Sequence, residues 1–348
     1  MKRVLITGGT GFVGSNLARR LVRDGHRVHL VVRPGHATWR IQPIAGGITL
    51  LDADLADGAS VERVVAQAQP DWIFHLAAFG AYPHQTDVET MVQTNVRGTC
   101  NLVAAALKVG VEALVNAGSS SEYGYKDHAP SEAEPLEPNS SYAWAKASAT
   151  LFCRHAAHQR GAHMPTLRLY SVYGPYEEPG RLLPSLIASG LRGELPPLVD
   201  PRVARDYVYV EDVADAFVRA AERRGPDPGA VYNVGTGVQT SLAEIVEVAR
   251  RRLGVAGEPR WGSMPNRSWD TDVWVSDIGK IRHDLGWQPA TTLEEGFGRF
   301  VDWCSANPQV RALYDAAIRR ATPAGSNGRS RAGEPARAHG GRRKQEDP

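Results

Sequence analysis

Short apolar runs alternate with amphipathic stretches along the first half of the chain. Five runs read as buried strands: 3–7, 27–32, 48–51, 72–78 and 113–117. Stretches with apolar positions at helical spacing follow, among them 60–69, 87–110 and 142–160. Because strands that alternate with helices form a parallel sheet covered on both faces, the pattern predicts an α/β fold with a doubly wound parallel sheet.

The second half has a looser pattern of the same kind. It predicts a helix with an internal proline at 181–193, a strand at 206–210, a helix at 211–223, a strand at 231–234 and a helix at 241–253. We expect residues 1–170 to form the sheet domain, with 205–237 returning to it. Residues 171–204 and 238–305 are expected to form a smaller, substrate-binding lobe. The segment 322–348 has few apolar residues and predicts a disordered tail.

Composition excludes several function classes. The 348 residues carry 40 Lys and Arg against 38 Asp and Glu, and the tail alone holds six basic and three acidic residues. The body before the tail is therefore close to −1, which argues against a nucleic-acid partner. The three cysteines (Cys100, Cys153 and Cys304) are widely spaced, which predicts a reducing compartment and no metal site. The chain has no run of 18 apolar residues and only a short apolar run at its start, so we expect a cytoplasmic protein without a membrane partner.

A glycine-rich turn follows the first strand directly. The sequence Gly8-Gly-Thr-Gly-Phe-Val-Gly14 lies between that strand and an amphipathic helix. Glycines at such a turn let the backbone approach a pyrophosphate, whose charge sits at the helix N-terminus. The motif predicts a Rossmann-type dinucleotide site; the alternative is a tight turn without a ligand.

The end of the second strand bears on the choice of dinucleotide. An acid that would bind the 2′-hydroxyl of NAD is missing there, and Arg33 stands in its place, with Arg40 as a possible helper. A guanidinium can pair with a 2′-phosphate. We therefore favour NADP(H), with NAD(H) possible; the alternative is that Arg33 is a solvated residue at a strand end.

Polar residues gather where the predicted strands end. The glycine turn, Arg33, Asp54, Ala77 and Ser119 all lie just past a strand, so they belong to one edge of the sheet, where such folds bind ligands. His75 lies inside an apolar strand, and we interpret it as a hydrogen-bonded core residue rather than a catalyst.

Tyr142 and Lys146 stand four residues apart in the helix predicted at 142–160, so they share one face of it. An ammonium about 6 Å from a phenol, at an effective dielectric of about 20, lowers the free energy of the phenolate by about 2.8 kcal/mol. A phenol active near pH 7 needs about 4 kcal/mol, so a second positive charge, such as an oxidised nicotinamide, is required. The alternative is an ordinary surface pair.

Taken in order, these motifs resemble the extended short-chain dehydrogenase/reductase family, the NAD(P)-dependent nucleotide-sugar epimerases, dehydratases and reductases. The resemblance rests on the glycine turn, Asp54-Leu55, His75-Leu-Ala-Ala78, Ser119 before Tyr123-Gly124, and Tyr142-x-x-x-Lys146. It continues through Leu167–Pro175, Arg205–Asp212, Tyr232–Gly237 and Leu285–Pro289. It thus spans residues 1 to about 305.

The resemblance implies a role for each matching residue. Tyr142 is the general acid/base, Lys146 binds the nicotinamide ribose and lowers the pKa of Tyr142, and Ser119 hydrogen-bonds the reacting oxygen. The remaining cofactor-binding residues are Gly8, Gly11, Phe12, Val13, Gly14, Arg33, Asp54, Leu55, Leu76, Ala77, Ala78 and Asn95. The substrate-binding residues are Ser120, Ser171, Arg205 and Arg267. Trp261, Trp269, Asp270 and Trp274 either line a sugar site or pack between lobes.

Two departures from the family pattern affect the function. Ser171 stands where the family usually has Asn. Dehydratases usually follow their Ser or Thr with Asp-Glu or Ser-Glu in a fixed register, whereas Ser120 and Ser121 occupy those positions and Glu122 falls one place late. A one-residue deletion would restore the match, with Ser120 then in the role of Ser119.

The expected substrate is a nucleoside diphosphate sugar, and the expected assembly is a homodimer. The arginine at the cofactor position favours an NDP-4-keto-6-deoxyhexose 4-ketoreductase, because net reduction consumes NADPH. The alternatives are an NDP-sugar 4-epimerase, then an NDP-hexose 4,6-dehydratase. A dinucleotide-binding redox sensor is the non-enzyme alternative, and loss of Tyr142 or Lys146 would be its mark; both are present.

Overall fold

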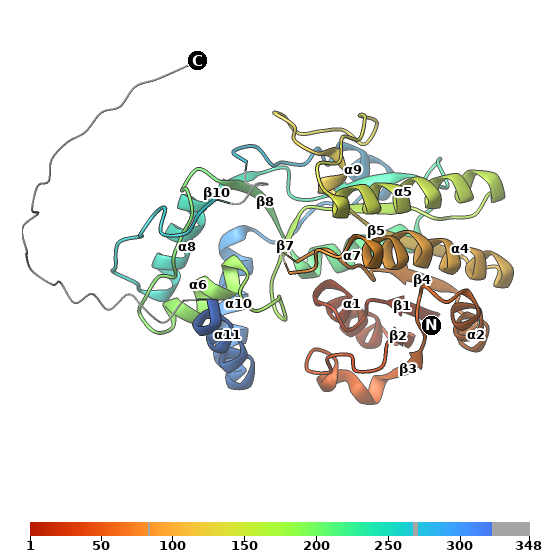
Figure 1. Ribbon diagram of the computed structural model, residues 1–348, viewed down its shortest axis with the longest axis horizontal. Coiled ribbons are helices and arrows are strands. Elements are labelled where there is room, and N and C mark those ends of the chain that lie inside the picture. The colour runs from red at the N-terminus through yellow and green to blue at the C-terminus, as the bar shows by residue number, and fades with distance from the viewer. Residues whose placement is uncertain (83, 267–270, 322–348) are drawn as a thin grey trace, which may run out of the picture.

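The computed structural model describes residues 1–82, 84–266 and 271–321, which form two units (Figure 1). A cleft lined by residues of both units lies between them. The first half of the chain holds β1 (Arg3–Thr7), α1 (Phe12–Arg23), β2 (Arg27–Val32), the 3₁₀ turn η1 (Gln42–Gly47), β3 (Ile48–Asp52), α2 (Gly58–Ala68), β4 (Trp72–His75), α3 (Val88–Met91), the π-helical turn η2 (Val92–Arg97), α4 (Gly98–Val109), β5 (Ala113–Ser119), the 3₁₀ turn η3 (Ser120–Tyr123) and α5 (Ser141–Arg160). The second half holds β6 (Thr166–Leu169), β7 (Ser171–Tyr173), α6 (Leu182–Gly190), β8 (Ala204–Tyr209), α7 (Val210–Glu222), β9 (Val231–Val234), β10 (Gln239–Ser241), α8 (Leu242–Leu253), α9 (Gly279–Leu285), α10 (Leu293–Ala306) and α11 (Pro308–Ala321).

Seven parallel strands form the larger sheet, in the order β3-β2-β1-β4-β5-β6-β9. The chain leaves β1 toward β3 and then returns past it to β4, so the strand order reverses beside β1. Ligands in such sheets bind at the carboxyl ends of the strands beside that reversal. The predicted doubly wound α/β fold is confirmed.

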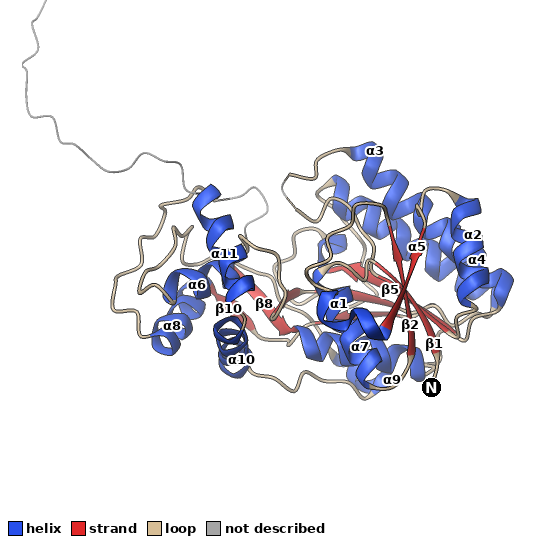
Figure 2. Cartoon of the chain, turned by 90° about the horizontal axis from the view of Figure 1, so that it is seen from below, coloured by secondary structure: helices blue, strands red, loops and turns tan. Residues whose placement is uncertain are grey.

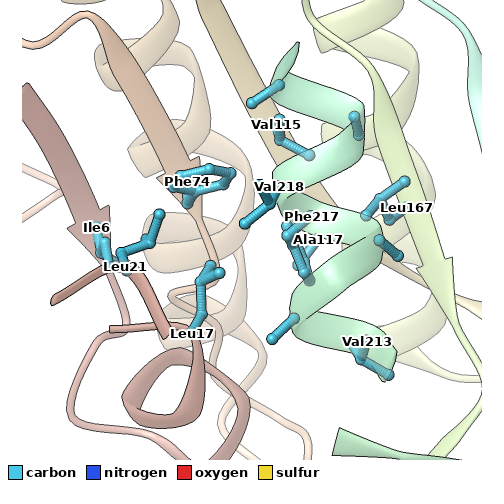
Figure 3. Close-up of a cluster of buried hydrophobic side chains, with 14 of the residues drawn as sticks. Ile6, Leu17, Leu21, Phe74, Val115, Ala117, Leu167, Val213, Phe217 and Val218 are labelled. Atoms are coloured by element: carbon cyan, nitrogen blue, oxygen red, sulfur yellow. The ribbon is translucent and has the colours of Figure 1, made fainter. Parts of the chain in front are cut away.

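Helices cover both faces of this sheet (Figure 2). Successive strand residues point to opposite faces, so Val4 and Ile6 of β1 pack with α1, α7 and α9, while Leu5 packs with α2, α4 and α5. On the first face Phe217 of α7 lies edge-to-face with Phe74 of β4, their ring centroids 6.1 Å apart (Figure 3). Burial of aromatic side chains of this size contributes a few kcal/mol each, which fixes the sheet as a rigid platform.

The smaller unit contains a three-stranded sheet of β10, β8 and β7, with α6, α8, α10 and α11 packed around an apolar core of its own. Within the segment 205–237, β9 pairs with β6 of the larger sheet and α7 packs on one face of that sheet. The segment does not return to this sheet as a whole, because β8 pairs with β7 and β10. The lobe boundaries themselves stay a proposal.

The long helix expected at 87–110 is interrupted by the π-helical turn η2, which carries Asn95. Such turns insert one residue into the helix and re-aim the side chains near it. Among the described residues, no helix combines the length and apolar character needed to cross a bilayer. The tail expected at 322–348 lies outside the described residues.

Candidate active site

A cleft of about 1880 Å³ lies at the carboxyl ends of the larger sheet and extends under the smaller unit. Its walls come from the turns after β1, β2, β3, β4 and β5, from the start of α5, and from the segments around α6 and β8. The expected site residues that line it are Gly8, Gly11, Phe12, Val13, Gly14, Arg33, Asp54, Leu55, Leu76, Ala77, Ala78, Ser119, Ser120, Tyr142, Lys146, Ser171 and Arg205. The fold thus brings together residues that are up to 197 positions apart in the chain.

The glycine turn is shaped so that side chains cannot replace its hydrogens. The amide of Gly11 donates to the Gly8 carbonyl at 3.0 Å. A Cβ on Gly14 would lie 2.3 Å from that carbonyl oxygen, and Gly8 has φ +71° with only 2.5 Å between its Cβ position and the Ala77 nitrogen. Because Gly11 is also the N-cap of α1 and has no side chain, the first amides of α1 stay available to an anion. These residues fit a dinucleotide pyrophosphate.

Arg33 lies at the rim of the cleft with its side chain exposed, just after β2. Asp54 lies after β3, where one carboxylate oxygen accepts the Ala56 amide at 2.9 Å. Arg40 does not help Arg33: its guanidinium is buried, donates to the Tyr176 carbonyl at 2.8 Å and pairs with Glu178 at 2.6 Å. The possible role of Arg40 beside a 2′-phosphate is therefore wrong, because its guanidinium is buried and already bonded to Tyr176 and Glu178.

His75 belongs to a buried chain of hydrogen bonds beneath the cleft. Thr99 Oγ1 donates to the Asn95 carbonyl at 2.6 Å, so it accepts from His75 Nε2 at 2.9 Å. The other ring nitrogen, Nδ1, then accepts from Thr7 Oγ1 at 2.6 Å. Burial, with Lys146 nearby, lowers the pKa of His75 to about 3, so the ring is neutral. This agrees with the interpretation of His75 as a hydrogen-bonded core residue.

Asn95 is the one expected cofactor residue within the described ranges that does not line the cleft. Its amide group is buried, accepts from the Phe79 nitrogen at 2.8 Å and donates to the Phe79 carbonyl at 2.8 Å. It fixes the segment after β4, which carries Leu76, Ala77 and Ala78 along the cleft floor. Asn95 can act on a ligand only through this segment, because the π-helical turn directs its side chain to the Phe79 backbone.

Tyr142 and Lys146 enter the cleft from the first two turns of α5. The helix begins after Ser140, whose hydroxyl accepts the Ala143 amide at 3.2 Å. Burial raises the pKa of Tyr142 to about 12, and the negative charge of Glu122 adds to the shift. The Ser119 side chain and the positive charge of Arg181 oppose this rise in the pKa. The expected lowering is therefore not achieved by the protein groups alone, since burial outweighs them.

Lys146 is buried within the second turn of α5. Burial lowers its pKa, and the charge of Glu122 opposes this. The pair thus sits in a region of low polarity, where the charge of any bound group acts strongly on both side chains.

The three serines after β5 have different partners. Ser119 caps the turn η3, and its Oγ lies 2.8 Å from the Oγ of Ser121. Ser120 instead accepts the indole hydrogen of Trp274 at 3.1 Å. Both Ser119 and Ser120 line the cleft; of the two, Ser119 is the one whose side chain acts on the pKa of Tyr142, which it lowers.

Arg205 and Trp274 form the wall on the side of the smaller unit. The Arg205 guanidinium lies 5.3 Å from the centroid of the Trp274 ring and donates to the Ala204 carbonyl at 2.7 Å. Ser171, the first residue of β7, lines the cleft nearby. Arg267, Trp269 and Asp270 lie outside the described residues.

Sequence reasoning missed three polar residues on the wall opposite Tyr142. Tyr82 and Arg181 line the cleft, with the guanidinium 5.3 Å from the Tyr82 ring centroid, and both act on the pKa of Tyr142. Glu177 lines it too, and burial raises the pKa of its carboxyl to about 8. The signals were local: Tyr82 follows a strand exit, and Glu177 and Arg181 flank the Pro179-Gly180 turn.

Comparison with known proteins places these features in context. The sequence model of the "NAD dependent epimerase/dehydratase family" matches residues 4–235. A UDP-glucose 4-epimerase of Mycolicibacterium smegmatis is 33% identical over 313 residues, which cover 86% of this chain and 98% of the relative. A dTDP-glucose 4,6-dehydratase of Xanthomonas campestris pv. campestris is 29% identical, covering 90% and 97%. Among solved structures, the UDP-glucose 4-epimerase of Thermus thermophilus in complex with NAD superposes with a TM-score of 0.78 at 29% identity, over 88% of this chain and 99% of that one.

Proposed function

The chain belongs to the NAD-dependent epimerase/dehydratase family, and from that membership we propose that it transfers a hydride at C4 of a hexose carried on a nucleoside diphosphate. It is an enzyme of this family, whose relatives here are nucleotide-sugar epimerases and dehydratases. The observation that carries the proposal is that Ser119 at the end of β5 and Tyr142 at the start of α5 line the same cleft, with Lys146 one turn further along α5.

The cofactor in this proposal is a nicotinamide dinucleotide bound along the glycine turn and over the floor of Leu76, Ala77 and Ala78. Support comes from the shape of the turn and from the NAD complex of the Thermus relative. Arg33 at the rim favours NADP(H), because its exposed guanidinium can pair with a 2′-phosphate. When bound, NADPH supplies the hydride.

We favour reduction of a 4-keto-6-deoxyhexose. The hydride forms the new C–H bond at C4, the carbonyl π electrons move to oxygen, and the phenol of Tyr142 gives that oxygen its proton. Ser119 holds the same oxygen by a hydrogen bond, and Lys146 provides positive charge beside the phenolate that remains. The ketone becomes an alcohol while NADPH becomes NADP⁺, and solvent returns the proton to Tyr142.

A 4-epimerase is the second candidate, because UDP-glucose 4-epimerases are among the relatives. It would use the same residues, with Tyr142 acting first as a base and the hydride returned within one turnover. A 4,6-dehydratase is less well supported, because Glu122 points away from the cleft instead of lining it. Nothing in the described site favours the redox sensor over an enzyme, since Tyr142 and Lys146 both face the cleft.

The proposed substrate lobe comprises 171–204 and 238–305. Arg205, at its edge, would bind the diphosphate, with Ser120 and Ser171 beside the sugar. We also propose a homodimer through α5. Trp144 and Leu151 lie two turns apart on one face of this helix and are 47% and 57% exposed.

Cofactor accounting tests the proposal. Purified protein is mixed with NADPH and a panel of nucleoside diphosphate 4-keto-6-deoxyhexoses, and the absorbance of reduced nicotinamide is followed. We expect NADPH to disappear in step with sugar reduction, about 10³-fold more slowly in Tyr142→Phe, which should still bind the dinucleotide. Interconversion of C4 epimers without NADPH consumption would instead establish the epimerase. Dinucleotide binding without any sugar turnover across both panels would leave only the sensor.

A further inference from the structure

Glu122 is a buried carboxylate directly behind the catalytic serine. It is the acidic residue of the turn η3, and its side chain is fully buried. The three serines before it (Ser119, Ser120 and Ser121) line the cleft. One of its oxygens accepts the Ser119 amide at 2.8 Å and the Thr150 hydroxyl at 3.0 Å. The carboxylate therefore ties the end of β5 to the middle of α5.

Arg168 of β6 is the charged partner of Glu122. Its Nε donates to the second carboxylate oxygen at 2.9 Å, and its side chain is 3% exposed. The guanidinium also lies 4.5 Å from the centroid of the Tyr123 ring. Gly118 leaves room for this arrangement, since a Cβ there would lie 2.8 Å from the Glu122 oxygen. With its oxygens used by these partners, Glu122 is not placed to touch a sugar.

The charge of Glu122 acts on both members of the Tyr142 and Lys146 pair. It disfavours the phenolate of Tyr142 and favours the ammonium of Lys146. The other groups facing Tyr142 are Arg181, which favours the phenolate, and Tyr82, which disfavours it. Lys146 also faces the Cys153 thiol and the neutral ring of His75.

We propose that Glu122 is a positioning residue: its carboxylate holds the Ser119 amide and also Thr150, which shares a face of α5 with Tyr142 and Lys146. It thereby fixes a negative charge beside that pair, so that Tyr142 serves as a proton donor. The carboxylate takes no proton from the sugar and gives none to it. This inference rests on the proposed reduction, in which a protonated Tyr142 is the form that reacts. It also gives the late register of Glu122 a physical meaning: the acid is turned away from the cleft and paired with Arg168.

The test measures ionisation of Tyr142 without any sugar. Phenolate formation is followed by ultraviolet difference spectroscopy on the protein with oxidised dinucleotide bound, with Tyr142→Phe subtracted to isolate this phenol. In Glu122→Gln we expect the titration to move down by about one pH unit, because a negative neighbour has been removed. Thr150→Val is the matched control: it removes a hydrogen bond to the same carboxylate without changing its charge, so the titration should stay near wild type.

The rate profile supplies the second readout. For reduction, the alkaline limb of kcat should shift downward in Glu122→Gln by the same amount as the phenolate titration. If the unpaired Arg168 prevents folding, the double variant Glu122→Gln/Arg168→Met removes both charges and is measured in its place. If the phenolate titration of a folded variant does not move, the inference is overturned, whether or not the variant keeps its activity. Failure to reduce any keto sugar would refute the proposed function but leave the titration result standing on its own.

Discussion

Tyr142 lies where a phenol is hard to ionise. Its pKa of about 12 is above the usual value of about 10, because burial and Glu122 outweigh Ser119 and Arg181. At neutral pH the residue is therefore a phenol that can give up a proton, and a role as base requires additional positive charge beside it. The direction of proton transfer at Tyr142 therefore depends on the charge of the dinucleotide bound beside it.

In the proposed function, Arg33 decides the choice between NADP(H) and NAD(H). Replacing Arg33 by Ala should raise the KM for NADPH by about 10- to 100-fold, because a charge-assisted hydrogen bond to a phosphate is worth about 1.5–3 kcal/mol. The KM for NADH should change little. Steady-state kinetics with both cofactors checks this.

The control for this prediction comes from the same strand. Arg27 is also exposed but lies at the opposite end of β2, away from the cleft, so Arg27→Ala should leave both KM values unchanged. Equal losses for NADPH and NADH in Arg33→Ala would refute a role at the 2′-phosphate.

Much of the site could be predicted one residue at a time, because the motifs name their own residue types. The glycine turn, Ser119, Tyr142 and Lys146 all line the cleft as expected. What the sequence could not show was the environment: burial of Tyr142, with the negative charge of Glu122 adding to it, raises a pKa that was expected to be lowered. Glu122 is itself buried and paired with Arg168. Partners 46 positions apart leave no local signal.

The turn that connects β7 to α6 is held in an unusual conformation. Tyr176 has a positive φ of 70°, which side chains rarely adopt. Its neighbours are held by two helices: Asn16 of α1 donates to the Pro175 carbonyl at 2.9 Å, and Tyr314 of α11 donates to the Glu177 carbonyl at 3.1 Å. Together with the hydrogen bond from Arg40 to the Tyr176 carbonyl, these contacts hold Glu177 in the wall of the cleft.

Glu177 should make stability depend on pH. Burial raises its pKa from the usual 4.5 to about 8, so the folded state favours the neutral acid. The stabilisation is complete below about pH 4.5 and is lost as the pH rises through 8. Glu177→Gln cannot ionise, so at pH 8.5 it should be more stable than wild type, by on the order of 3 kcal/mol, and about equal at pH 4.5. Thermal and urea unfolding at the two pH values measures this.

Glu258→Gln provides the comparison, since that side chain is 84% exposed and its loss should be neutral at both pH values. A Glu177→Gln protein that is less stable than wild type at pH 8.5 would mean that the carboxylate is stabilised by Arg181 and Arg40 more than burial penalises it.

Elements with a strong period were predictable to within a residue or two. β9 and the long helix α5 match their predicted ranges closely. The failures involve tertiary pairing: β8 reads as a strand from its own residues, yet only its partners β7 and β10 decide which sheet it joins. The π-helical turn within 87–110 was also invisible, because its residues keep a helical apolar pattern.

At the scale of the whole molecule, the two units contribute different residues to opposite sides of one cleft. The parallel sheet supplies the glycine turn, Ser119 and the α5 pair, while the smaller unit supplies Arg205 and Trp274. The hydrogen bond from Trp274 to Ser120 joins the two sides next to Ser119, the proposed catalytic serine.

Tracing the hydride tests the central claim most directly. The enzyme is supplied with NADPH deuterated at C4 of the nicotinamide and with a nucleoside diphosphate 4-keto-6-deoxyhexose, and the product is analysed by NMR and mass spectrometry. The account predicts one deuterium at C4 of the hexose, formed about 10³-fold more slowly by Tyr142→Phe. Deuterium at another carbon, or a reduced sugar without deuterium, would contradict it.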